Sequence, residues 1–177
     1  MPLSVQTLSK SVPFSGFRVL QGGVSGDSFN LTGAVAFDSV LGGAGGDNFT
    51  FNSGAILNGV LDGQGGADVL QGLAIDNVTL TGSTANGEFN GTENSINGSF
   101  LGIGNIVGTT LGMLTGESAA ATSTWALNGV APTYNDGTFS LNFTGFRTLQ
   151  GQGGIDLFNV TGASDFNLNG GDRKSVV

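Results

Sequence analysis

Short stretches of alternating apolar and polar residues run along the chain, and glycine-rich turns separate them. The segments 27–31 (DSFNL) and 47–51 (DNFTF) each place two large apolar side chains on one face of an extended backbone. Helix-forming residues are scarce, and 33 of the 177 residues are glycine, which costs about 1 kcal/mol in a helix interior. The pattern predicts an all-β fold built from short strands and tight turns.

One glycine-aspartate pattern occurs four times, and its copies align on the aspartates Asp27, Asp47, Asp68 and Asp156. In every copy a glycine lies five residues before the aspartate, and a large apolar residue lies two residues after it. The first three aspartates are 20 and 21 residues apart, and a fixed period of this length is typical of stacked coils. The sequence therefore predicts a β-solenoid, either a parallel β-helix or a β-roll, with coils of about 20 residues. Two interior columns are expected, one of Phe29, Phe49 and Leu70 and one of Leu20, Val40 and Leu61.

A longer repeat is superimposed on this pattern. The segment 14–22 (FSGFRVLQG) returns almost unchanged at 143–151 (FTGFRTLQG). No domain boundary is visible between them, so we expect residues 14–171 to form a single repeat array, preceded by a poorly ordered segment at 1–13. The last residues, 172–177 (DRKSVV), resemble a translated sequencing adapter. This resemblance predicts a non-native tail and a chain that is a piece of a longer protein.

The composition narrows the chemistry that this chain can perform. It contains no cysteine and no histidine, so disulfides, thiolate metal sites and the most common general base are excluded. Thirteen acidic residues against five basic ones give a net charge of −8, which disfavours nucleic acid as a partner and permits a hard cation such as Ca²⁺. No apolar run reaches the roughly 18 residues of a membrane span, so membrane insertion is not expected. The acidic residues recur singly at turns, and we therefore expect a scaffold and not an enzyme.

The second glycine-aspartate turn, 42–50 (GGAGGDNFT), resembles the nonapeptide GGxGxDxUx of the secreted bacterial calcium-binding (RTX) repeat proteins, in which U is a large apolar residue. The resemblance implies that Ca²⁺ binds through aspartate carboxylates and backbone carbonyls of stacked turns. By position it implies a metal site formed by Asp27, Asp47, Asp68, Asp156, Gly42, Gly45, Gly63 and Gly66. The copies recur about every 20 residues instead of in tandem, so the turns would stack along one edge of the coil only. Ordinary glycine-aspartate turns without calcium are the alternative.

The nested pattern as a whole resembles the repeat regions of large bacterial haemagglutinin-like adhesins over nearly all of residues 14–171. This resemblance implies a structural or adhesive segment of an extracellular or cell-surface protein, with neighbouring repeats and host or surface glycans as partners. A carbohydrate-acting β-helix enzyme and an ice-binding solenoid are the alternatives, because stacked carboxylates or rows of threonine would serve them. Three local expectations accompany this interpretation: Trp125 in the core, Arg18 and Arg147 in structural ion pairs, and a bulging loop at 112–123.

Overall fold

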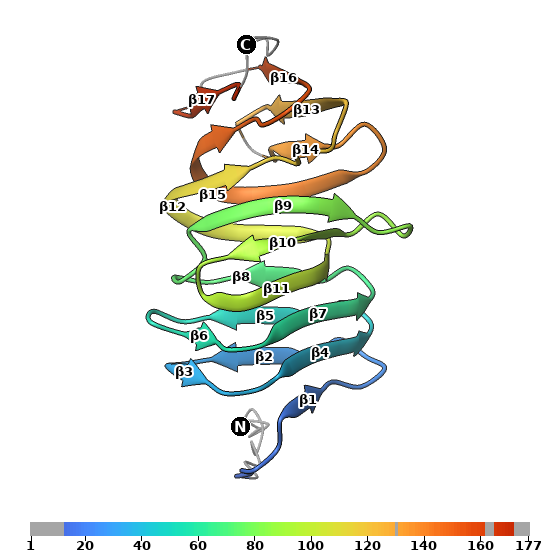
Figure 1. Cartoon of the computed structure of the whole chain (residues 1–177), viewed down its shortest axis with the longest axis vertical. Helices are drawn as coiled ribbons and strands as arrows, with labels where there is room; N and C mark the ends of the chain where they lie inside the picture. Colours follow the sequence, from blue (N-terminus) through green and yellow to red (C-terminus); the bar gives the residue numbers. More distant parts are fainter. Residues whose placement is uncertain (1–12, 130, 162–164, 172–177) are drawn as a thin grey trace, which may run out of the picture.

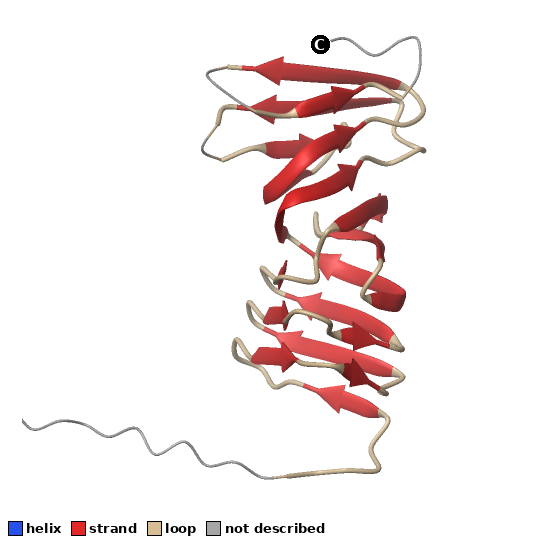
Figure 2. Ribbon diagram, turned by 90° about the vertical axis from the view of Figure 1, so that its left-hand side faces the viewer, coloured by secondary structure: helices blue, strands red, loops and turns tan. Residues whose placement is uncertain are grey.

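The structure is a computed structural model that describes residues 13–129, 131–161 and 165–171. Throughout these ranges the chain forms strands and loops without a helix, and its 17 strands join in one partly parallel sheet. The strands lie across the long axis of the molecule, and successive passes of the chain stack along it (Figures 1 and 2). The all-β prediction is confirmed. The stretches 1–12 and 172–177, for which a poorly ordered start and a non-native tail were predicted, lie outside the described residues.

Most strands are short, because glycine-rich turns interrupt the alternating pattern. The two longest, each of 11 residues, lie side by side as a parallel pair. In chain order the strands are β1 (Val19–Gln21), β2 (Ser28–Leu31), β3 (Ala34–Val35), β4 (Ser39–Ala44), β5 (Asn48–Phe51), β6 (Ile56–Leu57), β7 (Val60–Gly65), β8 (Val69–Gln71), β9 (Asn77–Ser83), β10 (Phe89–Glu93), β11 (Ile96–Ile103), β12 (Asn105–Thr115), β13 (Thr122–Leu127), β14 (Thr133–Asn135), β15 (Ser140–Gln150), β16 (Ile155–Val160) and β17 (Asn167–Asn169).

From β1 to β8 the strands pair in parallel with the strands one pass further along the chain. β1 pairs with β4 and β4 with β7, while β2 pairs with β5 and β5 with β8. Partner residues on these strands are 20 or 21 positions apart, as the aspartate spacing predicted. The two predicted columns are confirmed as Leu20–Val40–Leu61 and Phe29–Phe49–Leu70.

Beyond β8, antiparallel strands are inserted between the parallel strands of the stack. β10 pairs antiparallel with both β9 and β11, and β14 does so with both β13 and β15. Parallel partners are consequently further apart in sequence, as with Leu61 and Phe100 or Ile106 and Phe143. The predicted period of about 20 residues is therefore wrong for the part from β9 to β15. The expected loop at 112–123 is also wrong in part, because β12 continues to Thr115.

The interior of the stack is filled by aromatic and aliphatic side chains. The rings of Phe29 and Phe49 stack with their centroids 4.9 Å apart, and Trp125 stacks on Phe158 at 5.5 Å. Trp125 is fully buried, which confirms its predicted place in the core. Arg18 forms the predicted ion pair with an aspartate in the next pass of the chain, Asp38, whereas Arg147 forms no ion pair with a described residue.

Candidate functional site

The aspartates of the first three glycine-aspartate turns form a row inside the molecule. Asp47 and Asp68 are fully buried, while Asp27, at the N-terminal end of the row, is partly exposed. The backbone N–H of Asp27 donates a hydrogen bond to Oδ1 of Asp47 at 2.6 Å, and that of Asp47 donates to Oδ1 of Asp68 at 2.7 Å. The carboxylates of Asp47 and Asp68 thus each bind the N–H of the equivalent aspartate one coil earlier. We call the row of Asp27, Asp47 and Asp68 the aspartate ladder.

The glycine five residues before each aspartate makes room for the carboxylate. A Cβ atom on Gly42 would lie 2.3 Å from Oδ2 of Asp47, and a Cβ on Gly63 would lie 2.5 Å from Oδ2 of Asp68. Both distances are shorter than Cβ contacts in real proteins, so any larger residue would displace the carboxylate. The other two copies of the turn show the same relation. The repeated spacing of glycine and aspartate is therefore a steric requirement of an inward-facing carboxylate.

Gly45 and Gly66 have a different role, which is to turn the backbone. Their φ angles are +97° and +139°, conformations that residues with a Cβ rarely adopt. Gln64, which replaces the second glycine of the motif, has a φ of +68° and is the one non-glycine residue with positive φ among the described positions. All four glycines were predicted as part of a metal site. In the structure Gly42 and Gly63 leave room for the carboxylates, and Gly45 and Gly66 allow the backbone to turn.

Two carboxylate oxygens of the ladder have no hydrogen-bond partner among the described residues, namely Oδ2 of Asp47 and Oδ2 of Asp68. A buried polar atom without a partner is costly. Burial raises the pKa of Asp68 to about 6; the hydrogen bond from the N–H of Asp47 opposes this shift, while the nearby acidic charges add to it. Asp68 therefore takes up a proton more readily than an exposed aspartate does.

We expect Asp68 to contribute stability that is gained as the pH falls from about 7.5 to about 4.5 when divalent cations are absent. Folded Asp68 keeps its proton up to about pH 6, whereas the unfolded chain releases it near pH 4. The stabilisation is therefore fully present below about pH 4 and is lost as the pH rises towards 6. The expected gain in the free energy of unfolding is about 2 kcal/mol, measured by chemical denaturation at both pH values.

Asp68→Asn removes the titrating group and should abolish most of this pH dependence. At about pH 7.5 the variant should also be more stable than the original protein, because the charge at position 68 is then no longer buried. Asp165→Asn, at an exposed position, is the matched control and should keep the original pH profile. A profile unchanged by Asp68→Asn would show that other groups cause the effect.

Asp156 lies apart from the ladder, in β16 near the C-terminal end of the stack (Figure 1). Ser123 in the neighbouring strand β13 lies in register with Asp156, and its Oγ donates a hydrogen bond to Oδ1 of Asp156. The indole N–H of Trp125 lies 3.5 Å from the same oxygen. The turn at Asp156 thus keeps the inward carboxylate but replaces the backbone donor of the ladder with a serine hydroxyl.

Three further buried acids escaped the sequence analysis, namely Glu88 and the two described here, Glu93 and Glu117. Oε2 of Glu93 accepts the N–H of Ser95 at 2.5 Å, so this carboxylate caps the turn between β10 and β11. Glu117 has a buried Oε1 without a hydrogen-bond partner among the described atoms. Burial raises the pKa of both glutamates, which adds to the acid stabilisation expected from Asp68. The Glu-x-Ser sequence at a turn is a usable signal for Glu93, whereas nothing in the sequence near Glu117 marks it as buried.

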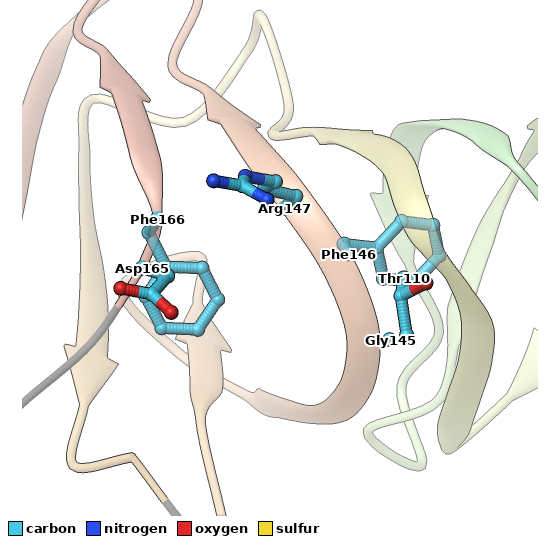
Figure 3. A pocket seen from close by; sticks show the side chains of 6 residues that line it. All are labelled: Thr110, Gly145, Phe146, Arg147, Asp165 and Phe166. Carbon is cyan, nitrogen blue, oxygen red and sulfur yellow. The ribbon is translucent and has the colours of Figure 1, made fainter.

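A separate hollow of about 280 Å³ lies beside β15, and its lining is shown in Figure 3: Thr110, Gly145, Phe146, Arg147, Asp165 and Phe166. Arg147 lies between Phe146 on one side and Asp165 with Phe166 on the other. Phe146 is almost completely buried, so the exposed side chains of the lining are those of Thr110, Arg147 and Asp165, with Phe166 half-buried. Glycoside hydrolysis requires a pair of carboxyl groups, and the lining of this hollow supplies one.

Within the described ranges, no group of three or more acidic, histidine or cysteine side chains is arranged to hold a metal ion. The same part of the chain has no helix that is long and apolar enough to cross a membrane. Comparisons of the chain with protein-family models, curated proteins and solved structures find no match. The function is therefore inferred from the stacked strands and the aspartate ladder.

Proposed function

We propose that this chain is a β-solenoid segment with a structural role, acting as a rigid elongated spacer within a larger extracellular bacterial protein. The observation that carries the proposal is the in-register stack from β1 to β8, in which equivalent residues lie over one another. The residue types of the repeat all serve this stack: glycines turn the chain and make room, aspartates connect coils, and apolar residues fill the columns. The extracellular location rests on the resemblance to secreted calcium-binding and haemagglutinin-like repeats.

The outer faces of the stack are the surfaces that such a spacer offers to partners. Outward polar residues lie in register there, as Asn30, Thr50 and Gln71 do, and the amide of Gln71 donates a hydrogen bond to the hydroxyl of Thr50 at 3.0 Å. Rows of amides and hydroxyls match the hydrogen-bonding groups of sugars. Host or surface glycans are therefore the partner class included in this proposal.

Inserting one extra coil tests the structural role. A second copy of residues 40–60 placed after Val60 keeps every register, because Val40 and Leu61 are direct partners. A repeat spacer should accept the insertion, keep its β signal in circular dichroism, and lengthen by about 4.8 Å in small-angle X-ray scattering. The same residues inserted in scrambled order form the control and should destabilise the protein. Loss of the fold in the ordered insertion would contradict the proposal.

We also propose that Ca²⁺ stabilises the aspartate ladder. The support is the pair of unpartnered Oδ2 atoms on Asp47 and Asp68, with backbone carbonyl oxygens beside them. Ca²⁺ binds carboxylate and carbonyl oxygens, and in the ladder it would remove the cost of burying these charges. Millimolar Ca²⁺ should therefore raise the melting temperature by about 5 °C and suppress the acid stabilisation described above.

Asp47 is the central member of the ladder, so its loss should affect calcium binding most. Asp47→Asn should reduce the calcium-dependent rise in melting temperature, and Asp156→Asn, outside the ladder, is the matched control. Circular dichroism melts with Ca²⁺ and with a chelator measure both variants. If millimolar Ca²⁺ changes neither the β signal nor the melting temperature of the original chain, the turns are glycine-aspartate corners without a metal.

A further inference from the structure

The motif that occurs at 14–22 and again at 143–151 contains an arginine, and only one of the two arginines has a partner. In the first copy, Nε and Nη2 of Arg18 donate hydrogen bonds to the two carboxylate oxygens of Asp38. In the second copy, the equivalent Arg147 has neither an ion pair nor a hydrogen bond with a described residue. The same position of the motif therefore connects two passes of the chain in one copy and leaves a guanidinium unpaired in the other.

The register of the sheet explains this difference. In both copies the leucine of the motif pairs with a residue of the next pass, and the position two residues before that partner lies beside the arginine. This position is Asp38 in the first copy and Phe166 in the second. The aspartate of the second region, Asp165, lies one position earlier in the chain. An aromatic ring therefore lies where the first copy has the acceptor of its ion pair.

A bulge in β12 brings a further polar side chain to the other side of Arg147. The residues 108–111 of β12 lie opposite a single residue of β15, Gly145. Gly145 has a φ of +81°, and a Cβ on Gly108 would lie 2.5 Å from the ring of Phe146, so both glycines are needed for this arrangement. The bulge places the exposed Thr110 at the hollow beside β15. Bulges commonly direct a side chain towards a site in this way.

Three passes of the chain thus supply one exposed polar group each to the hollow of about 280 Å³: the hydroxyl of Thr110, the guanidinium of Arg147 and the carboxylate of Asp165. None of these three side chains forms a hydrogen bond with another described residue. Figure 3 shows Arg147 between Phe146 and Phe166, and of these two rings only that of Phe166 is partly exposed. Small-molecule sites begin at about 300 Å³, so the hollow has room for one small ring compound.

The charges of the hollow favour a neutral ligand with several hydroxyl groups. An anion beside Arg147 would also face Asp165, and the net charge of −8 disfavours anions further. An amine beside Asp165 would face the guanidinium. A hydroxyl group avoids both conflicts, because it accepts a hydrogen bond from a guanidinium and donates one to a carboxylate. A flat apolar side chain next to a few converging polar groups completes the usual composition of a ligand site.

We propose that the hollow beside β15 is a binding site for a single neutral sugar ring. Arg147 donates hydrogen bonds to the sugar hydroxyls, Asp165 accepts them, Thr110 does either, and the ring of Phe166 packs against the C–H face of the sugar. The inference rests on the glycan part of the proposed function, to which it gives a location, and it is independent of the spacer role and of the calcium proposal.

A titration of the full ¹⁵N-labelled chain with sugars tests this site. The probes are the methyl glycosides of glucose, galactose, mannose and N-acetylglucosamine, each added up to about 50 mM, which detects dissociation constants in the millimolar range. At least one of them should shift the Nε–H signal of Arg147 in a saturable way. The Nε–H signal of Arg18, which is held by Asp38, is the internal control and should not move.

Two variants then test the roles of the side chains, with the affinity measured from the saturation-transfer signals of the sugar. Arg147→Gln should weaken binding at least about tenfold, because hydrogen bonds from a charged donor are lost. Phe166→Leu keeps an apolar side chain but removes the flat ring, and it should weaken binding about fivefold. Arg18→Gln is the matched control from the other copy of the motif and should leave the affinity unchanged. Circular dichroism checks that each variant is folded.

Three outcomes would overturn the proposal. Sugar binding that Arg147→Gln leaves unchanged would place the glycan site elsewhere on the molecule, and the glycan part of the proposed function would stand without this site. A shift of the Arg147 signal by methyl glucuronide or by glycine, but by none of the neutral sugars, would show that the ligand is charged. No shift with any probe would show that the hollow is empty surface, whereas the insertion of an extra coil would still decide the spacer role.

Discussion

Phe49→Ala is expected to lower the free energy of unfolding by about 3–5 kcal/mol. Phe49 is fully buried and stacks on the ring of Phe29 at 4.9 Å, with Leu70 in register on its other side. Because it lies in the middle of the column, the resulting cavity removes contacts with the coils on both sides. Denaturant titration followed by circular dichroism measures the loss.

Phe17→Ala is the control for this substitution, because it removes the same side chain from a position that is largely exposed. It should change the stability of the dilute protein by less than about 0.5 kcal/mol. Similar losses in both variants would show that Phe49 does not belong to a packed interior column.

Gly42→Ala is expected to cost about 3 kcal/mol, even though it adds a single methyl group. The new Cβ would lie 2.3 Å from Oδ2 of Asp47 and 2.6 Å from the carbonyl oxygen of Gly63 in the next coil. The carboxylate could rotate away only by losing the hydrogen bond from Asp27, and the carbonyl belongs to the backbone and cannot rotate away at all. A thermal melt should therefore show a lower transition temperature.

Gly82→Ala is the matched control, because a Cβ at Gly82 meets no atom within 4 Å. It should leave stability unchanged or raise it slightly, since alanine restricts the unfolded chain. If Gly42→Ala were as stable as Gly82→Ala, the carboxylate of Asp47 would not lie over Gly42.

The first part of the fold could be predicted because equivalent residues stack directly on one another there. Phe29 and Phe49, for example, have the same side chain and are strand partners 20 positions apart. In this part of the fold, the spacing of similar residues in the sequence therefore gives the pairing of residues in the sheet. The antiparallel strands break this relation, because they are inserted between two parallel partners. The Asn86-Gly87 pair, between β9 and β10, is a hairpin signal that would have predicted one of them.

The inward direction of the aspartates was the main feature that the sequence analysis did not predict. The sequence predicts turns that stack along one edge of the coil, and it does not predict that their carboxylates point inwards. The constant spacing from Gly42 to Asp47 and from Gly63 to Asp68 does indicate an inward carboxylate, because a turn alone does not require a glycine five residues before the aspartate. The serine that binds Asp156 could not be found in this way, since Ser123 lies outside every copy of the motif.

The hydrogen bonds of the aspartate ladder all point the same way along the molecule. The N–H belongs to the earlier coil and the carboxylate to the later one. During synthesis from the N-terminus, each donor of the ladder therefore leaves the ribosome before the carboxylate that accepts its hydrogen bond, so the order in which the ladder can close is the order in which its aspartates are made.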